Sequence, residues 1–102
     1  MDIESFKASL AEDAPPPASS LALQALWWAG RQDWDRAHGV AQQDEGNPAC
    51  DWVHAYLHRV EGDEGNARYW YRRARQPWPT QPPEQEWDAI GTELLTRTGQ
   101  QA

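Results

Sequence analysis

Four side chains able to ligate a metal or transfer a proton recur along one predicted helix. They are Asp51, His54, His58 and Glu61. Spacings of three and four residues bring them to one side of a helix. Two histidines at positions i and i+4 can chelate a metal ion, and a carboxylate one turn away could complete its coordination. These residues are the candidate metal ligands.

A helical zinc-protease motif has the same histidine spacing but requires glutamate directly after the first histidine. Ala55 occupies that position, so the general base is missing. In the alternative interpretation the row is structural: His58 packs between helices and its ring nitrogens bond to carboxylates. Isolated pairs of this kind are common on helices. We therefore favour the structural interpretation, and predict no bound metal and no cofactor.

A nucleophilic dyad would have to draw on His38, His54 or His58 together with Cys50. The chain contains no oxyanion-hole motif and no nucleophile elbow to support such a dyad. It also lacks a glycine-rich phosphate loop. We predict that the protein is not an enzyme.

Three side chains suited to partner binding lie on the side of the same helix away from Val53 and Leu57. Trp52, Tyr56 and Arg59 converge there at helical spacing. Trp, Tyr and Arg are the residues most often found as binding hot spots, which favours a recognition surface. Packing of the two rings against the N-terminal helix or its linker is an equally open alternative.

A basic row is predicted on the following helix of this otherwise acidic chain: Arg68, Arg72 and Arg75. Its functional interpretation is a site for an anion or an acidic peptide. The favoured alternative is intramolecular pairing, because charge rows on helices are usually solvated faces. The pairing carboxylates would be those of the last helix: Glu84, Glu86, Asp88 and Glu93.

Composition limits the class of protein. The 102 residues carry a net charge of −7, and such a surplus of acid disfavours nucleic acid as a partner. Aliphatic residues are scarce, but 7 Trp and 3 Tyr can supply an aromatic core. Cys50 is the single cysteine, which excludes an intramolecular disulfide. The chain has no apolar run of membrane-spanning length and no visible signal sequence, so we expect a cytoplasmic protein without a membrane partner.

Helix start and stop signals divide the chain into helices. Residues 1–18 form an N-terminal segment, a short amphipathic helix followed by a proline-rich linker, and residues 19–99 form one helical domain. Asp33, Asn47 and Asp63 are predicted caps, and Gly62-Asp63 is a tight turn. The predicted helices span residues 2–12, 20–29, 34–45, 48–61, 64–75 and 84–98.

The central helices contain an internal repeat. An offset of 30 residues aligns Ala25, Asp33 and Ala37 with Ala55, Asp63 and Ala67. Segments 32–37 and 62–74 resemble the turn and second helix of tetratricopeptide repeats. The first copy departs at Gln32, where glycine is usual, and the offset is about one helical turn shorter than the family's repeat of about 34 residues.

The resemblance, which covers residues 20–76, implies an all-α stack of antiparallel hairpins with capping helices at both ends. It also implies a binding role but assigns no partner. We predict a non-enzymatic interaction module that binds a protein or a peptide. One alternative is a self-associating structural protein, a homodimer, because the face of Leu23 and Trp27 needs cover. The other is a metal- or small-ligand-binding protein that uses the histidine row.

Overall fold

Four central helices each begin at a capping side chain. In each case a side-chain oxygen of the cap accepts a hydrogen bond from a backbone N–H of the first turn, which has no partner inside the helix. The caps and helices are Ser20 with α2 (Leu21–Gly30), Asp33 with α3 (Trp34–Ala41), Asn47 with α4 (Pro48–Val60) and Asp63 with α5 (Glu64–Ala74).

The two hairpins, α2–α3 and α4–α5, turn in the same way. In both, the backbone N–H of the capping aspartate donates to the carbonyl five residues earlier, with an N···O distance of 2.9 Å for Asp33 and for Asp63. The residue before each cap has a positive φ, 62° at Gln32 and 83° at Gly62. Glycine adopts this conformation freely, whereas glutamine does so at a cost.

Small residues let the helices of each hairpin approach closely. The first hairpin has Ala25 on α2 and Ala37 on α3, and the second has Ala55 on α4 and Ala67 on α5. None of these four alanines has exposed surface. A larger side chain at such a position would force the helices apart.

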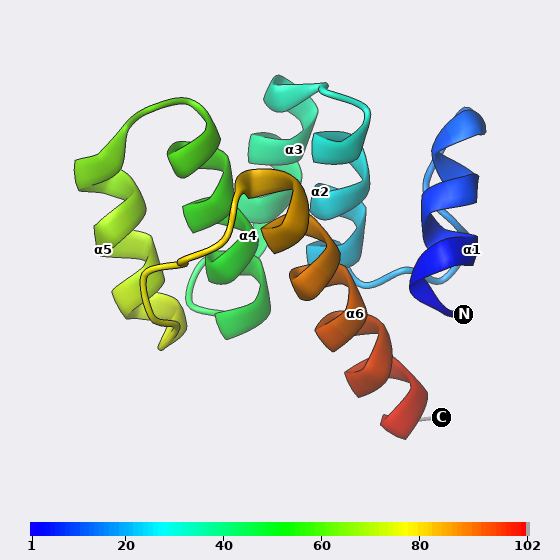
Figure 1. The fold of residues 1–102 in the computed structure, drawn as a ribbon. Coiled ribbons are helices and arrows are strands. Elements are labelled where there is room, and N and C mark those ends of the chain that lie inside the picture. The colour runs from blue at the N-terminus through cyan, green and yellow to red at the C-terminus, as the bar shows by residue number, and fades with distance from the viewer. Residues whose placement is uncertain (102) are drawn as a thin grey trace.

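The remaining elements close the ends of the stack. α1 (Ile3–Ala8) continues into a 3₁₀ turn at Ser9–Ala11, a second 3₁₀ turn follows α3 at Gln42–Asp44, and the last helix is α6 (Pro83–Gln101). α6 crosses α2 and α4 and also contacts α1 (Figure 1). Its aromatic and aliphatic stripe packs mainly against the first helices of the two hairpins, α2 and α4.

The N-terminal segment covers the apolar face of α2. Phe6 is 1% exposed and its ring lies 5.7 Å from that of Trp87 on α6. Trp27 Nε1 donates to Ser9 Oγ at 3.0 Å, and both Leu23 and Trp27 are buried. The face that suggested self-association is therefore covered within one chain.

The computed structural model describes the backbone of residues 1–101 and the side chains of residues 1–97. The protein is an all-α globule of six packed helices, with a radius of gyration of 12.4 Å. That radius matches the roughly 13 Å expected for one compact domain of this length. Among the described residues no helix combines the length and apolarity needed to cross a membrane.

Candidate metal centre

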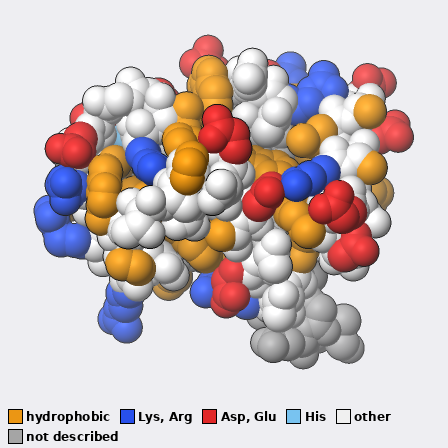
Figure 2. All heavy atoms as spheres, viewed as in Figure 1, with side chains coloured by type: hydrophobic (Ala, Val, Ile, Leu, Met, Phe, Trp, Pro, Cys, Tyr) orange, Lys and Arg blue, Asp and Glu red, His pale blue; other side chains and the backbone are white. Residues whose placement is uncertain are grey.

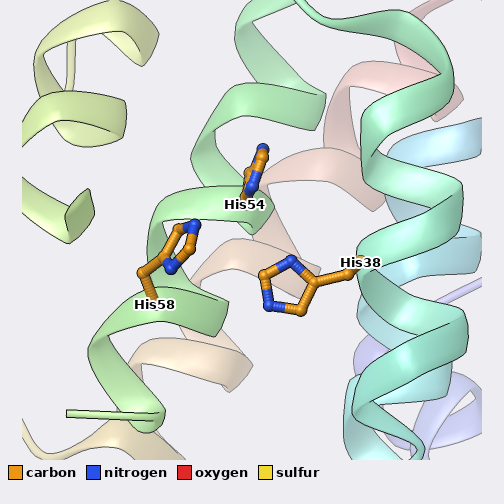
Figure 3. A group of neighbouring side chains, drawn as sticks. All are labelled: His38, His54 and His58. Atoms are coloured by element: carbon orange, nitrogen blue, oxygen red, sulfur yellow. The ribbon is translucent and has the colours of Figure 1, made fainter. Parts of the chain in front are cut away.

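The three histidines of the chain come together between α3 and α4. His38 projects from α3, and His54 and His58 project toward it from successive turns of α4 (Figure 3). One ring nitrogen of each lies within 4.8 Å of those of the other two. His38 and its neighbours therefore form a cluster of three potential nitrogen ligands from two helices.

Aromatic packing fixes the innermost ring. His54 is 3% exposed and lies in a stack between Trp70 and His58, with ring centroids 4.0 Å and 4.9 Å away and interplanar angles of 22° and 21°. His38 meets both α4 histidines edge to face, at 5.3 Å and 5.1 Å. The cluster is held by ring contacts rather than by hydrogen bonds among the imidazoles.

Two buried ring nitrogens of this cluster lack a hydrogen-bond partner in the described part of the chain, Nδ1 of His54 and Nδ1 of His58. Leaving a buried polar atom unpaired costs on the order of 1–3 kcal/mol. We expected the ring nitrogens of His58 to bond to carboxylates. This is wrong for its Nδ1, which lies 3.9 Å from Glu61 Oε2 and 3.7 Å from Asp63 Oδ2, beyond hydrogen-bond distance.

Glu61 orients the third ring. Its Oε1 lies 2.5 Å from Nε2 of His38. A carboxylate only accepts, so neutral His38 carries its proton on Nε2 and its lone pair on Nδ1. In metal sites, a carboxylate behind a ligating histidine commonly fixes the tautomer and the ring orientation in this manner.

Electrostatics keep the inner rings neutral. Burial, followed by the nearby imidazoles of His58 and His38 and then the guanidinium of Arg73, lowers the pKa of His54 to about 4. Burial and His38 also lower the pKa of His58, against the opposing pull of Glu61 and Asp63. Because only a neutral imidazole can ligate a metal, these rings are in the ligating form at neutral pH.

The cluster is slightly wider than a formed metal site. Nitrogens bound to one tetrahedral zinc ion at about 2.0–2.1 Å lie about 3.3 Å apart. The widest separation of 4.8 Å would therefore have to close by about 1.5 Å. His38 on the eight-residue helix α3 and His58 on α4 are both partly exposed, so these two rings have more room to move than the buried His54.

The predicted ligand row divides in the structure. His54 and His58 join the cluster, Glu61 lies behind His38, and Asp51 lies outside it. Asp51 Oδ1 accepts from the backbone N–H of Gly46 at 3.1 Å, and Oδ2 lies 3.8 Å from Arg73 Nε. Sequence reasoning did not place His38 among the ligands, because helical spacing relates residues of one helix only.

The predicted recognition trio is held inside the fold. Arg59 donates from Nη1 to Glu86 Oε1 at 2.8 Å and from Nη2 to the carbonyl of Gln81 at 2.7 Å. Tyr56 is 5% exposed, and Trp52 is partly buried against the core. The expectation of a shared exposed surface is wrong for Tyr56 and Arg59, because α6 and the segment before it cover this side of α4.

The basic row has different neighbours from those expected. Arg68 Nη2 lies 3.5 Å from Glu64 Oε1 on its own helix, and its guanidinium lies 4.3 Å from the Trp78 ring centroid. Arg72 and Arg75 are exposed. The carboxylates of α6 pair elsewhere: Glu86 with Arg59, Asp88 with Lys7 and Glu93 with Arg97.

Cys50 is buried in the core at the start of α4. Burial, with smaller contributions from Asp44 and Asp51, raises the pKa of its thiol to about 11. The thiol therefore stays protonated at neutral pH and supplies no thiolate nucleophile.

Comparison with known proteins adds no family or relative. No protein-family model matches the sequence, no curated protein matches it, and no solved structure matches the fold. The chemistry of the described side chains is therefore the basis for any functional assignment.

Proposed function

We propose that the protein binds one divalent transition-metal ion through His38, His54 and His58, with water in the fourth position. The observation that carries the proposal is the unpaired, buried Nδ1 of His54 inside a cluster of three imidazoles. An ion would satisfy ring nitrogens that the protein itself leaves without partners. Glu61 would hold His38 in the tautomer that directs Nδ1 to the ion.

The donor set favours zinc or a neighbouring first-row ion. Imidazole suits zinc, copper and nickel, whereas magnesium and calcium prefer oxygen ligands. Because the inner rings are neutral, few protons compete with the metal at neutral pH. A pair of ligands on α4 and one on α3 would also tie the two hairpins together.

Titration calorimetry tests the proposal on chelator-treated protein without an affinity tag. We expect one zinc ion per chain, and the same site should give Co²⁺ a visible spectrum typical of tetrahedral coordination. His38→Gln and His58→Gln should each abolish stoichiometric binding. Wild-type protein without stoichiometric binding, or either variant binding as wild type does, would contradict the assignment.

Two glutamate substitutions separate the contact between Glu61 and His38 from a general effect of negative charge on zinc affinity. Glu61→Gln should weaken zinc binding by roughly 10–100-fold, the usual loss when the carboxylate behind a ligating histidine is removed. Glu64→Gln, three residues later at the start of α5, removes the same charge from a side chain that pairs with Arg68 and not with a histidine. Its affinity should stay within about twofold of wild type.

We further propose that α2–α5 are two divergent hairpin repeats of the tetratricopeptide type. The supporting observations are the two matching turns, each with a positive φ before the cap, and the pair of buried alanines in each hairpin. The shorter repeat and the missing glycine at Gln32 would be adaptations of the first copy. If the two turns are equivalent, Gln32→Gly should stabilise the first and Gly62→Ala should destabilise the second.

A further inference from the structure

A hollow of about 320 Å³ opens between the second half of α5 and the proline-rich segment that follows it. Its lining consists of two guanidinium groups, two aromatic rings, one amide and one proline: Arg68, Arg72, Tyr71, Trp78, Gln76 and Pro77.

The lining is positively charged in a protein of net charge −7. Arginine side chains gather over α5 at the left edge of Figure 2. The Arg68 guanidinium stacks 4.3 Å from the Trp78 ring centroid, which leaves its N–H edge available to an acceptor. Its bond to Glu64 is a solvent-exposed pair on one helix, and such pairs contribute little.

The walls of the hollow are fixed before any ligand arrives. The Tyr71 hydroxyl donates to the buried carboxylate of Glu86, which anchors the inner wall. The backbone N–H of Gln76 donates to the carbonyl of Tyr71 at 2.9 Å, and Pro77 restricts the chain that carries Trp78. A pre-organised site loses less conformational freedom when it binds.

We infer that this hollow binds a glutamate or aspartate side chain of an acidic peptide segment in a partner protein. Arg68 and Arg72 would pair with the carboxylate, and Trp78 would pack against the neighbouring part of the peptide. The volume suits one or two side chains rather than a long polymer. A nucleic acid would bring many phosphates against the acidic remainder of the surface, which opposes its binding.

Fluorescence anisotropy tests the inference with a fluorescein-labelled, capped hexapeptide that carries two adjacent glutamates among glycines and serines. The titration is made in the presence of chelator, so that the metal proposal plays no part. We expect saturable binding at low ionic strength. Arg68→Gln with Arg72→Gln should weaken it at least tenfold. The matched control is Arg36→Gln with Arg97→Gln, because Arg36 also stacks on a tryptophan, 4.6 Å from the Trp28 ring centroid, and also pairs with a carboxylate of its own turn.

Binding by the control variant should remain within about twofold of wild type. If the Arg68/Arg72 variant loses its helical circular dichroism, the test is made by NMR on the wild-type protein instead. The measured quantities are the chemical-shift changes of the indole and guanidinium N–H groups when the peptide is added. Those shifts should then be confined to Arg68, Arg72 and Trp78. Equal losses in both double variants, shifts elsewhere, or no saturable binding would overturn the inference.

Two further measurements identify the occupant. A labelled oligothymidylate that binds more tightly than the peptide would overturn the peptide assignment in favour of nucleic acid. Sedimentation should give a monomer, because the inference commits to a partner protein. A dimer of wild-type protein that dissociates in the Arg68/Arg72 variant would overturn it in favour of a second copy of this chain.

Discussion

Arg59 on α4 and Glu86 on α6 form a partly buried ion pair, with Nη1 of the first 2.8 Å from Oε1 of the second. The Glu86 carboxylate is 3% exposed and also accepts from the Tyr71 hydroxyl of α5. One carboxylate thus joins α4, α5 and α6. Burial and the bond to Glu86 raise the pKa of Tyr71, so its hydroxyl remains a donor over the whole working pH range.

Removing this carboxylate should destabilise the protein. Glu86→Ala removes the carboxylate partner of the partly buried Arg59 charge and of the buried Tyr71 hydroxyl, and a loss of about 3 kcal/mol in the free energy of unfolding is expected. Urea denaturation measures it. Glu84→Ala, which removes an exposed glutamate two residues earlier, is the control and should change stability by less than about 0.5 kcal/mol. Similar small effects of both substitutions would contradict a structural role for the pair.

The turn between α2 and α3 should improve with glycine. Gln32 has a φ of 62°, which costs a non-glycine residue about 1 kcal/mol. Gln32→Gly should therefore raise the free energy of unfolding by roughly 0.5–1 kcal/mol. Gly62→Ala, at a φ of 83° in the second turn, should lower it by a similar amount. If both substitutions lower stability, the two turns are not equivalent.

The crossing of α4 and α5 should not accept a large residue at position 67. Ala67 has no exposed surface, so Ala67→Phe should destabilise by roughly 1–3 kcal/mol through overpacking. Thermal melts followed by circular dichroism measure the effect. Ala89→Phe on the exposed face of α6 controls for the loss of a helix-favouring alanine. A wild-type melting temperature for Ala67→Phe would rule out the close crossing.

Acid should destabilise the protein through His54. Its pKa is about 4 in the folded chain, against about 6.5 when unfolded, so the unfolded chain binds the extra proton between these values. Stability from this group is complete above about pH 6.5 and falls as the pH drops toward 4, with roughly 2 kcal/mol lost by pH 5. The lowered pKa of His58 acts in the same direction.

Urea titrations of wild type and His54→Leu at pH 7.5 and pH 5 isolate this contribution. Between pH 7.5 and pH 5, the free energy of unfolding should fall by roughly 2 kcal/mol less in the variant than in the wild type. The pKa of His54 is lowered first by burial and then by its neighbours His58, His38 and Arg73. NMR titration of the His54 ring in the wild-type protein measures this pKa directly. An NMR midpoint near 6.5 would contradict the buried, neutral ring.

Metal binding should increase the free energy of unfolding. Zinc at 100 times its dissociation constant should raise the free energy of unfolding by about 2.7 kcal/mol, if the unfolded chain does not bind it. The measurement is a melting curve with and without zinc at pH 7.5. His38→Gln should remove the increase, whereas Asp51→Asn, outside the cluster, should retain it. An equal increase in both variants would indicate binding elsewhere.

Much of the helical architecture was predictable because its causes are local. Ser20, Asn47 and the aspartates at 33 and 63 cap the helices that follow them. A cap depends on backbone groups only two or three residues away, so its effect can be predicted from the sequence. The α4 histidines also share a face because of spacing alone.

The tertiary structure decided which side chains meet across helices. Helical spacing put Arg59 beside Trp52 on an open face, but α6 covers that face and buries the charge against Glu86. The same spacing aligned Asp51 with the histidines, yet a hydrogen bond from Gly46 draws it away and His38 arrives from α3. Periodicity relates residues along one helix; how two helices pack depends on all the side chains between them.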